Sequence, residues 1–338
     1  MDADSRGQPG AAAEVIRLAA LLGLLGLAAA TGIIIANGYQ QILAALAQAG
    51  WGIIWASLFH LVPMTCCIIG WRALMPERQR PSHAFFLYVL WLRTSMNNLL
   101  PVARIGGEIL AARVMIKHGI RNTSAIASTV VETTLSVIGV FLFDVIGITM
   151  FALHISDKHV GWRLAAGLLM SVPVIAALVV VQRIGFFGLL SKIFNMMFRT
   201  TWEKFAGGAA RLDRAVHAMY RRKDRILICG FWQFMAWVMG VPEIWLALQF
   251  LGHPLPWAEC FMIEALIQAS SSVAFAVPGA IGVQEASFLV FGQMLGLTPE
   301  VAVALAVMRR CRDLLLYIPG LIVWQIQEGR WLLGKTTK

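Results

Sequence analysis

Residues 18–71 read LAALLGLLGLAAATGIIIANGYQQILAALAQAGWGIIWASLFHLVPMTCCIIGW and contain no Lys, Arg, Asp or Glu. An α-helix needs about 20 apolar residues to cross a bilayer, so this stretch is too long for one span. Asn37 and Gly38 interrupt it. The pattern predicts a first, uncleaved membrane helix at about 16–36, an interfacial segment at 42–49 and a second helix at about 51–71.

The remainder of the chain has the same apolar character. Of its 338 residues, 59% are apolar and 14% are charged, whereas a soluble domain carries about 25% charged residues. In water such a chain would expose large apolar surfaces. Further helices are predicted at 125–153, 162–182, 226–251, 257–273 and 301–317, with a last piece at 321–333 after a break at Pro319 and Gly320. The predicted fold is all-α and polytopic, with about eight membrane helices.

The basic residues set the expected topology. The formal charge of +10 does not indicate nucleic-acid binding here, because the Lys and Arg residues flank apolar segments. Membrane proteins carry such basic flanks on the cytoplasmic side. Residues 183–225 carry ten Lys/Arg against three acids, which predicts a cytoplasmic loop on anionic lipid, with amphipathic helices at 186–198 and 202–220 lying on the inner leaflet. The expected organisation is a polar N-terminus (1–15), a membrane half (16–182), the basic loop (183–225), a second membrane half (226–333) and a tail (334–338), with both termini cytoplasmic.

Two segments, near 93–113 and near 270–285, interrupt the apolar pattern inside the membrane halves. In each, a Glu follows a Pro by seven residues: Glu108 after Pro101, and Glu285 after Pro278. Broken backbone at membrane depth is tolerated only where it is buried or lines a wet cavity. Glycines and polar side chains surround both breaks, namely Asn97, Asn98, Gly106, Gly107, Gly279, Gly282 and Gln284. The pair is either an internal, inverted repeat whose half-helix ends face a substrate, or two ordinary kinks or surface loops with a chance likeness.

Ionisable residues in apolar segments are costly and usually functional. The candidates are Arg104, Glu108, Arg113, Glu132, Asp144, Glu243, Glu264, Glu285, Arg309, Arg310, Arg312 and Asp313. Each either contacts substrate or belongs to a structural pair, such as Arg309 with Asp313 at i,i+4. Three arginines in four positions suit a lipid phosphate; the alternative is a positive-inside flank.

Several chemistries have no sequence signal. There is no GxxxxGK[ST], HExxH or GxSxG motif. The seven histidines show no ligand spacing, and the five cysteines form no CxxC pair. We therefore expect no metal, no cofactor and no enzymatic activity.

At these motifs the sequence resembles a known family. The stretch Asn97–Pro101 with Gly106-Gly107-Glu108 and Arg113 resembles its N-terminal signature, and Pro278–Glu285 resembles its P-G-x-x-G-x-x-E element. Arg309–Asp313 followed by Tyr317–Gly320 resembles its C-terminal segment. The family is the flippase-like membrane domain of lysylphosphatidylglycerol synthetases (multiple peptide resistance factor), and within it the chain is similar to the stand-alone, hopanoid-associated subgroup.

The resemblance implies a bacterial inner-membrane protein that moves a lipid between leaflets. Full-length relatives carry a soluble aminoacyl-transferase domain that we expect this chain to lack, so the lipid could be a phospholipid, an aminoacylated lipid or a hopanoid. Two other hypotheses stay open: a subunit of a lipid-modifying enzyme, and a non-catalytic scaffold acting through the basic loop. The expected partners are membrane lipids, with lipid-biosynthesis enzymes and a second copy of the chain as further candidates.

Overall fold

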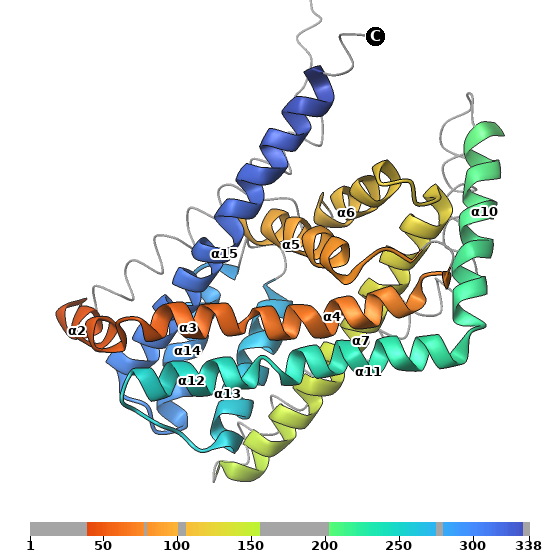
Figure 1. Cartoon of the computed structure of the whole chain (residues 1–338). Helices are drawn as coiled ribbons and strands as arrows, with labels where there is room; N and C mark the ends of the chain where they lie inside the picture. Colours follow the sequence, from red (N-terminus) through yellow and green to blue (C-terminus); the bar gives the residue numbers. More distant parts are fainter. Residues whose placement is uncertain (1–38, 78–79, 101–105, 156–202, 275–279, 334–338) are drawn as a thin grey trace, which may run out of the picture.

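The computed structural model describes residues 39–77, 80–100, 106–155, 203–274 and 280–333, and the elements in these ranges are helices (Figure 1). Several sequence predictions fall outside these ranges. They are the first helix at 16–36, the segment at 162–182, residues 183–202 of the basic loop, and Pro101, Arg104, Pro278 and Gly279.

The helices form two series of the same order. The first series is α2 (Tyr39–Ala49), α3 (Gly52–Phe59), α4 (Leu61–Leu74), α5 (His83–Leu99), α6 (Gly106–Lys117) and α7 (Asn122–His154). The second is α10 (Glu203–Tyr220), α11 (Lys223–Val238), α12 (Val241–Phe250), α13 (Trp257–Val273), α14 (Val283–Met294) and α15 (Pro299–Leu333). In both, an interrupted helix precedes a helix of 17 residues, a helix of 12 residues and a long helix of 33 or 35 residues.

Three described segments are long and apolar enough to cross a membrane: Gly52–Leu74, Asn122–His154 and Lys223–Phe250. The first and third are each built from two stacked helices, divided at His60 and at Met239–Gly240. The prediction of an all-α, multi-pass membrane protein is confirmed. The total of about eight membrane helices stays a prediction.

A shared offset of 177 residues relates the second parts of the two series. Helices α6 and α14 begin at 106 and 283, and α7 and α15 begin at 122 and 299. Two residues after the last residue of each helix stands a glycine with positive φ, Gly119 (φ +92°) after α6 and Gly296 (φ +94°) after α14. In each case the next amide bonds back across the last turn, from Ile120 to the carbonyl of Met115 and from Leu297 to that of Gly292. These are two copies of one Schellman ending, for which glycine is favoured because φ is positive.

The two series pack into each other. Helix α4 lies along α11, and the two run antiparallel (Figure 1). The long helix α7 packs on α13 of the second series, while α15 packs on α5 and α3 of the first. These reciprocal contacts, with the antiparallel pair at their centre, support the inverted-repeat alternative over two chance kinks.

The predicted break at Pro319 and Gly320 is wrong, because α15 continues through Pro319 to Leu333. Proline removes one amide and disturbs the carbonyls one turn earlier. Here the indole of Trp91, on α5, donates to the carbonyl of Leu316 at 2.6 Å. The carbonyl that loses its amide partner is that of Leu315, so this bond engages the neighbouring carbonyl and joins α15 to α5 beside the proline.

The amphipathic helix predicted at 202–220 is present as α10 (Glu203–Tyr220), but from residue 210 onward its large apolar side chains are not available to the leaflet. Leu212, Val216 and Met219 are buried in a cluster with Val131 and Leu135 of α7. The exposed side carries Arg211 and Arg214. Helix α10 is therefore held by the protein core and presents its basic side outward.

Replacing either Schellman glycine should destabilise the protein by about 1 kcal/mol, because an L side chain at positive φ is strained. No atom lies within 4 Å of a Cβ built at Gly119 or Gly296, so the cost comes from the backbone alone. Unfolding in detergent should show similar losses for Gly119→Ala and Gly296→Ala. Gly230→Ala, in the middle of α11, is the control and should lose nothing, because a Cβ there would make only an ordinary contact with Leu135 at 4.0 Å. Equal stability of all three variants would contradict the shared ending.

Candidate functional site: two buried ionic clusters

The first cluster, here the Arg93 cluster, joins α5, α6, α7 and α11. Arg93 donates from Nε to Glu108 at 2.8 Å, from Nη1 to Glu132 at 2.5 Å and from Nη2 to Thr133 at 3.2 Å. The other carboxylate oxygen of Glu132 accepts from the Gln233 amide at 2.8 Å. Glu132 is 2% exposed, so its charge depends on these partners. The planar guanidinium of Arg93 donates to two carboxylates through different nitrogens, a fixed fork geometry that the ammonium group of a lysine lacks.

The surroundings of Arg93 hold it in place. Its guanidinium lies over the Trp71 ring at 5.2 Å, a cation–π contact from α4. One turn later, the Asn97 side-chain oxygen accepts from the Gly107 amide at 2.9 Å. That bond satisfies an amide at the start of α6 and ties it to the end of α5 across the break.

The second cluster, here the Arg312 cluster, lies on α15 and its neighbours. Arg312 donates from Nη1 to Glu243 of α12 at 2.5 Å, and from Nη2 to Asp313 at 2.6 Å. His60 has Nδ1 2.8 Å from Glu243 and Nε2 3.0 Å from the Tyr317 hydroxyl. A neutral imidazole that donates from Nδ1 to Glu243 and accepts from Tyr317 satisfies both contacts. His60 stands where α3 meets α4, so the interruption of that span delivers a ring to this cluster.

Arg309 and Arg310 each have their own carboxylate in the Arg312 cluster. Arg309 donates to Glu264 of α13 at 2.6 Å and lies 5.7 Å from the Phe288 ring centre. The predicted i,i+4 pair of Arg309 with Asp313 is therefore wrong; Asp313 lies instead against Arg312 and, at 3.6 Å, Arg310. Spacing along one helix could not reveal a better acceptor on a helix 45 residues away.

Arg310 and Glu285 join the second break to α15. Arg310 donates from Nε to Glu285 at 2.6 Å. The other Glu285 oxygen accepts from the Gly282 amide at 2.7 Å, at the start of α14. A carboxylate in this position is stabilised by the helix N-terminus as well as by the arginine. Three arginines in the Arg312 cluster thus face four carboxylates, and no arginine forms an open phosphate cradle.

The two breaks use the same contact positions with different side chains. In the first half, Glu108 accepts a hydrogen bond from Thr133 at 3.2 Å. The residues 177 positions later in the chain are Glu285, in place of Glu108, and Arg310, in place of Thr133, and these two are also hydrogen-bonded. Across the first break Asn97 bonds Gly107, and across the second Gln284 donates to Ser271 at 3.1 Å. The repeat therefore extends to the clusters themselves.

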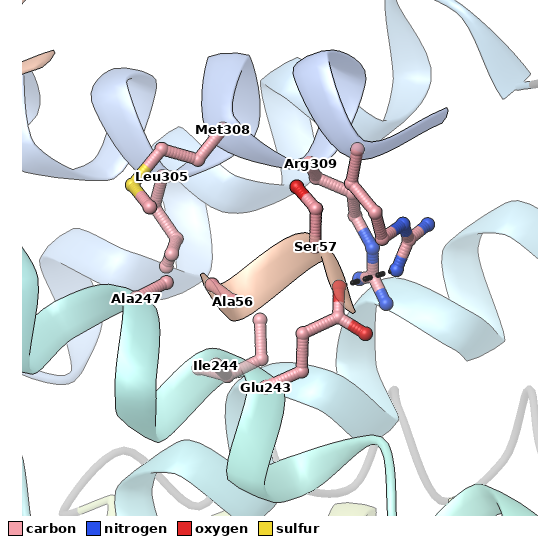
Figure 2. A pocket seen from close by; sticks show the side chains of 9 residues that line it. Ala56, Ser57, Glu243, Ile244, Ala247, Leu305, Met308 and Arg309 are labelled. Atoms are coloured by element: carbon pink, nitrogen blue, oxygen red, sulfur yellow. Dashed lines mark hydrogen bonds and ion pairs between the residues drawn. The ribbon is translucent and has the colours of Figure 1, made fainter. Parts of the chain in front are cut away.

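A small cavity of about 20 Å³ lies beside the Arg312 cluster, between α3, α12 and α15 (Figure 2). Glu243, Arg309 and Arg312 line its polar side and Ser57 its rim, while the apolar side is formed by Ala56, Ile244, Ala247, Leu305 and Met308. The volume suits about one water molecule between polar groups. Among the described residues, Nη1 of Arg309 is a buried donor without a hydrogen-bond partner.

Most of the predicted site residues fall into the two clusters. Arg113 lies apart, paired with Glu328 at 2.5 Å, and Asn98 is half-buried at the end of α5. Asp144 is buried on α7. Among the described residues no group of three or more His, Cys, Asp or Glu could hold a metal ion. The sequence prediction missed Arg93, His60, Gln233 and Tyr317, although a lone Arg in an apolar run and a lone His in a long uncharged stretch were usable signals.

Comparison with known proteins gives one match. The family described as the lysylphosphatidylglycerol synthase TM region matches residues 15–320. No curated protein and no solved structure matches the chain. The matched range includes both breaks and both clusters.

Removing Arg93 should cost about 3–5 kcal/mol of stability, because Glu132 would stay buried without its cation. Unfolding of Arg93→Gln in detergent measures this loss. Arg113→Gln is the matched control: its side chain is 49% exposed, and its pair with Glu328 should be worth about 1 kcal/mol or less. Adding Glu132→Gln to Arg93→Gln should recover part of the loss. Equal effects of Arg93→Gln and Arg113→Gln would contradict the assignment of a buried, coupled cluster.

Proposed function

Because the chain belongs to the family of the lysylphosphatidylglycerol synthase TM region, we propose that it is a lipid transporter, not an enzyme. It moves a polar-headed lipid between the leaflets of the bacterial inner membrane. Phosphate-bearing, aminoacylated and hopanoid lipids are the candidate substrates. The family name connects the chain to lipid headgroups that combine a phosphate with an amine.

One observation carries the proposal: charged side chains gather at the two helix breaks, inside an otherwise apolar bundle. Glu132, Glu264, Arg309 and Arg312 are each less than 10% exposed. Apolar packing would hold the helices together at lower cost than desolvated ion pairs. Charges placed at paired breaks of an inverted repeat match the arrangement in which transporters bind polar substrates.

Each cluster has a member that reaches the surface. In the Arg93 cluster it is Glu108, with 23% of its side chain exposed, and in the Arg312 cluster it is Arg310, also 23%. One is an acid and the other a base, so the first contacts suit a headgroup that carries both an amine and a phosphate. Behind each of them lie buried groups of the opposite charge.

The arginines act by exchanging partners. Each is already paired with a carboxylate, so a headgroup phosphate must displace Glu285 from Arg310, or Glu264 from Arg309. Such exchange keeps every charge compensated while the headgroup passes, and the acyl chains stay in lipid. This replaces the open arginine cradle expected from the sequence.

The scaffold hypothesis has one observation in its favour. Helix α10 and the start of α11 expose the bases Arg211, Arg214, Arg221, Arg222 and Lys223. These suit the anionic inner leaflet or an acidic protein surface. In that case function would depend on this corner and not on the clusters.

Translocation of labelled lipid in proteoliposomes that contain only this protein tests the transporter. Glu285→Ala and Arg312→Ala should each lower the rate at least tenfold, because each removes a partner that the exchange needs. Labelled phosphatidylglycerol and a cationic aminoacyl lipid should be compared as substrates.

Arg222→Ala, at the exposed end of α10, is the control and should keep the wild-type rate. Unchanged transport in a correctly inserted Glu285→Ala or Arg312→Ala protein would remove that residue from the path. Absence of transport by the folded wild type, for any lipid, would favour the scaffold.

A further inference from the structure

Asp144 is an acid for which the two clusters provide no partner. It lies on α7, is 5% exposed, and its Oδ1 has no hydrogen-bond partner among the described residues. A carboxylate without a cation is very costly at such a site, far more so than a neutral carboxyl group. This residue therefore favours the state in which it carries a proton.

Helix α7 approaches α13 closely around Asp144. The preceding residue, Phe143, has its ring centre 4.6 Å from that of Phe261. One turn further on, a Cβ at Gly147 would overlap the Cβ of Ala265. Asp144 thus stands where the backbones of α7 and α13 are nearly in contact.

On α13, between Phe261 and Ala265, lies Glu264, which is 2% exposed and belongs to the stretch of α13 that packs on α7 around Asp144. Its Oε1 accepts from Arg309 at 2.6 Å and from Gln268 at 3.1 Å. Its Oε2 is buried and, like Oδ1 of Asp144, has no partner among the described residues. Two carboxyl groups on packed turns of α7 and α13 are not both ionised at low cost in an apolar setting. Because Glu264 is paired with Arg309 and Asp144 has no cation among the described residues, the proton is favoured on Asp144.

We propose that Asp144 and Glu264 form a proton-binding site that couples lipid movement to proton movement. The proposal rests on the transport function proposed above. With the proton on Asp144, Glu264 is ionised and holds Arg309. When the proton moves to Glu264, that carboxyl group releases Arg309, which then binds a headgroup oxygen. Arg309 lines the cavity and has a buried donor to offer.

The neighbouring charges favour this sequence. On α15, Arg309 is followed by Arg312, which is compensated by Glu243 of α12 and by Asp313. Nδ1 of His60 lies 2.8 Å from Glu243 and 3.3 Å from Nη1 of Arg312. From α14 the Phe288 ring, which carries no charge, lies 5.7 Å from the guanidinium of Arg309. Among the described groups, Glu264 is therefore the one that links Asp144 to the Arg312 cluster.

Two measurements test the proposal, with Asp144→Asn as the variant and Asp224→Asn as a matched control. Asp224 is an exposed acid at the start of α11. The first measurement is infrared spectroscopy of the purified protein at pH 7. The wild type and Asp224→Asn should show the band of a protonated carboxyl group, and Asp144→Asn should lack it. A wild type without that band would overturn the proton site whether or not the protein moves lipid.

The second is the distribution of labelled phosphatidylglycerol between leaflets under an imposed pH difference. One pH unit corresponds to 1.36 kcal/mol per proton, so one proton per lipid should change the leaflet ratio about tenfold in the wild type and in Asp224→Asn. Asp144→Asn should give a ratio that does not respond to the pH difference. Wild-type movement that ignores the pH difference would overturn the coupling and leave the transport function standing. A wild type that moves no lipid would overturn both.

Discussion

Charge compensation inside an apolar bundle is the constraint on which this structure depends. A lone arginine or carboxylate at membrane depth is far more costly than a paired one, and removing one partner costs more than the pair is worth. Arg93 joins α5 to α6 and α7, Arg309 joins α15 to α13, and Arg312 joins α15 to α12. Sliding any of these helices by one turn would leave buried charges unpaired. The ion pairs therefore define the register of helices whose apolar surfaces would tolerate many alignments.

The repeat explains why there are two clusters and why they differ. Both halves place a Glu early in the 12-residue helix, at 108 and 285, and both let it bond the long helix that follows. In the first half the arginine, Arg93, lies on the 17-residue helix α5 and the acid, Glu132, on the long helix α7. In the second half the arrangement is reversed, with Glu264 on the 17-residue helix α13 and Arg309 on the long helix α15. Each cluster also takes a residue from the other half, Gln233 in one and His60 in the other. A movement of one half against the other would therefore disturb both clusters together.

The sequence was sufficient for the features that depend on composition and on local spacing. The uncharged run at 18–71 predicted a membrane protein, and the apolar segment at 257–273 has the bounds of α13. The Pro-to-Glu spacing left an inverted repeat and two chance kinks as open alternatives, because local spacing does not separate them. Predictions failed where a distant residue decides the outcome. Pro319 does not end α15, which continues to Leu333, and beside the proline Trp91 donates to the carbonyl of Leu316 from 225 residues away. The contact of His60 with Tyr317 spans 257 residues, and no local pattern encodes it.

Partner exchange connects the fold to its proposed work. The described amides of Gly107 and Gly282 are already satisfied, by Asn97 and by Glu285, and each arginine of the Arg312 cluster is already paired with a carboxylate. A headgroup can advance only where a carboxylate gives up its arginine, and a carboxylate does this at least cost when it takes up a proton. Glu264 is placed for that event, since it pairs with Arg309 and lies on the stretch of α13 that packs on α7 around Asp144. Buried charges have to stay compensated, and this requirement sets the register of the helices. In the proposed mechanism the same requirement couples movement of the lipid to movement of a proton.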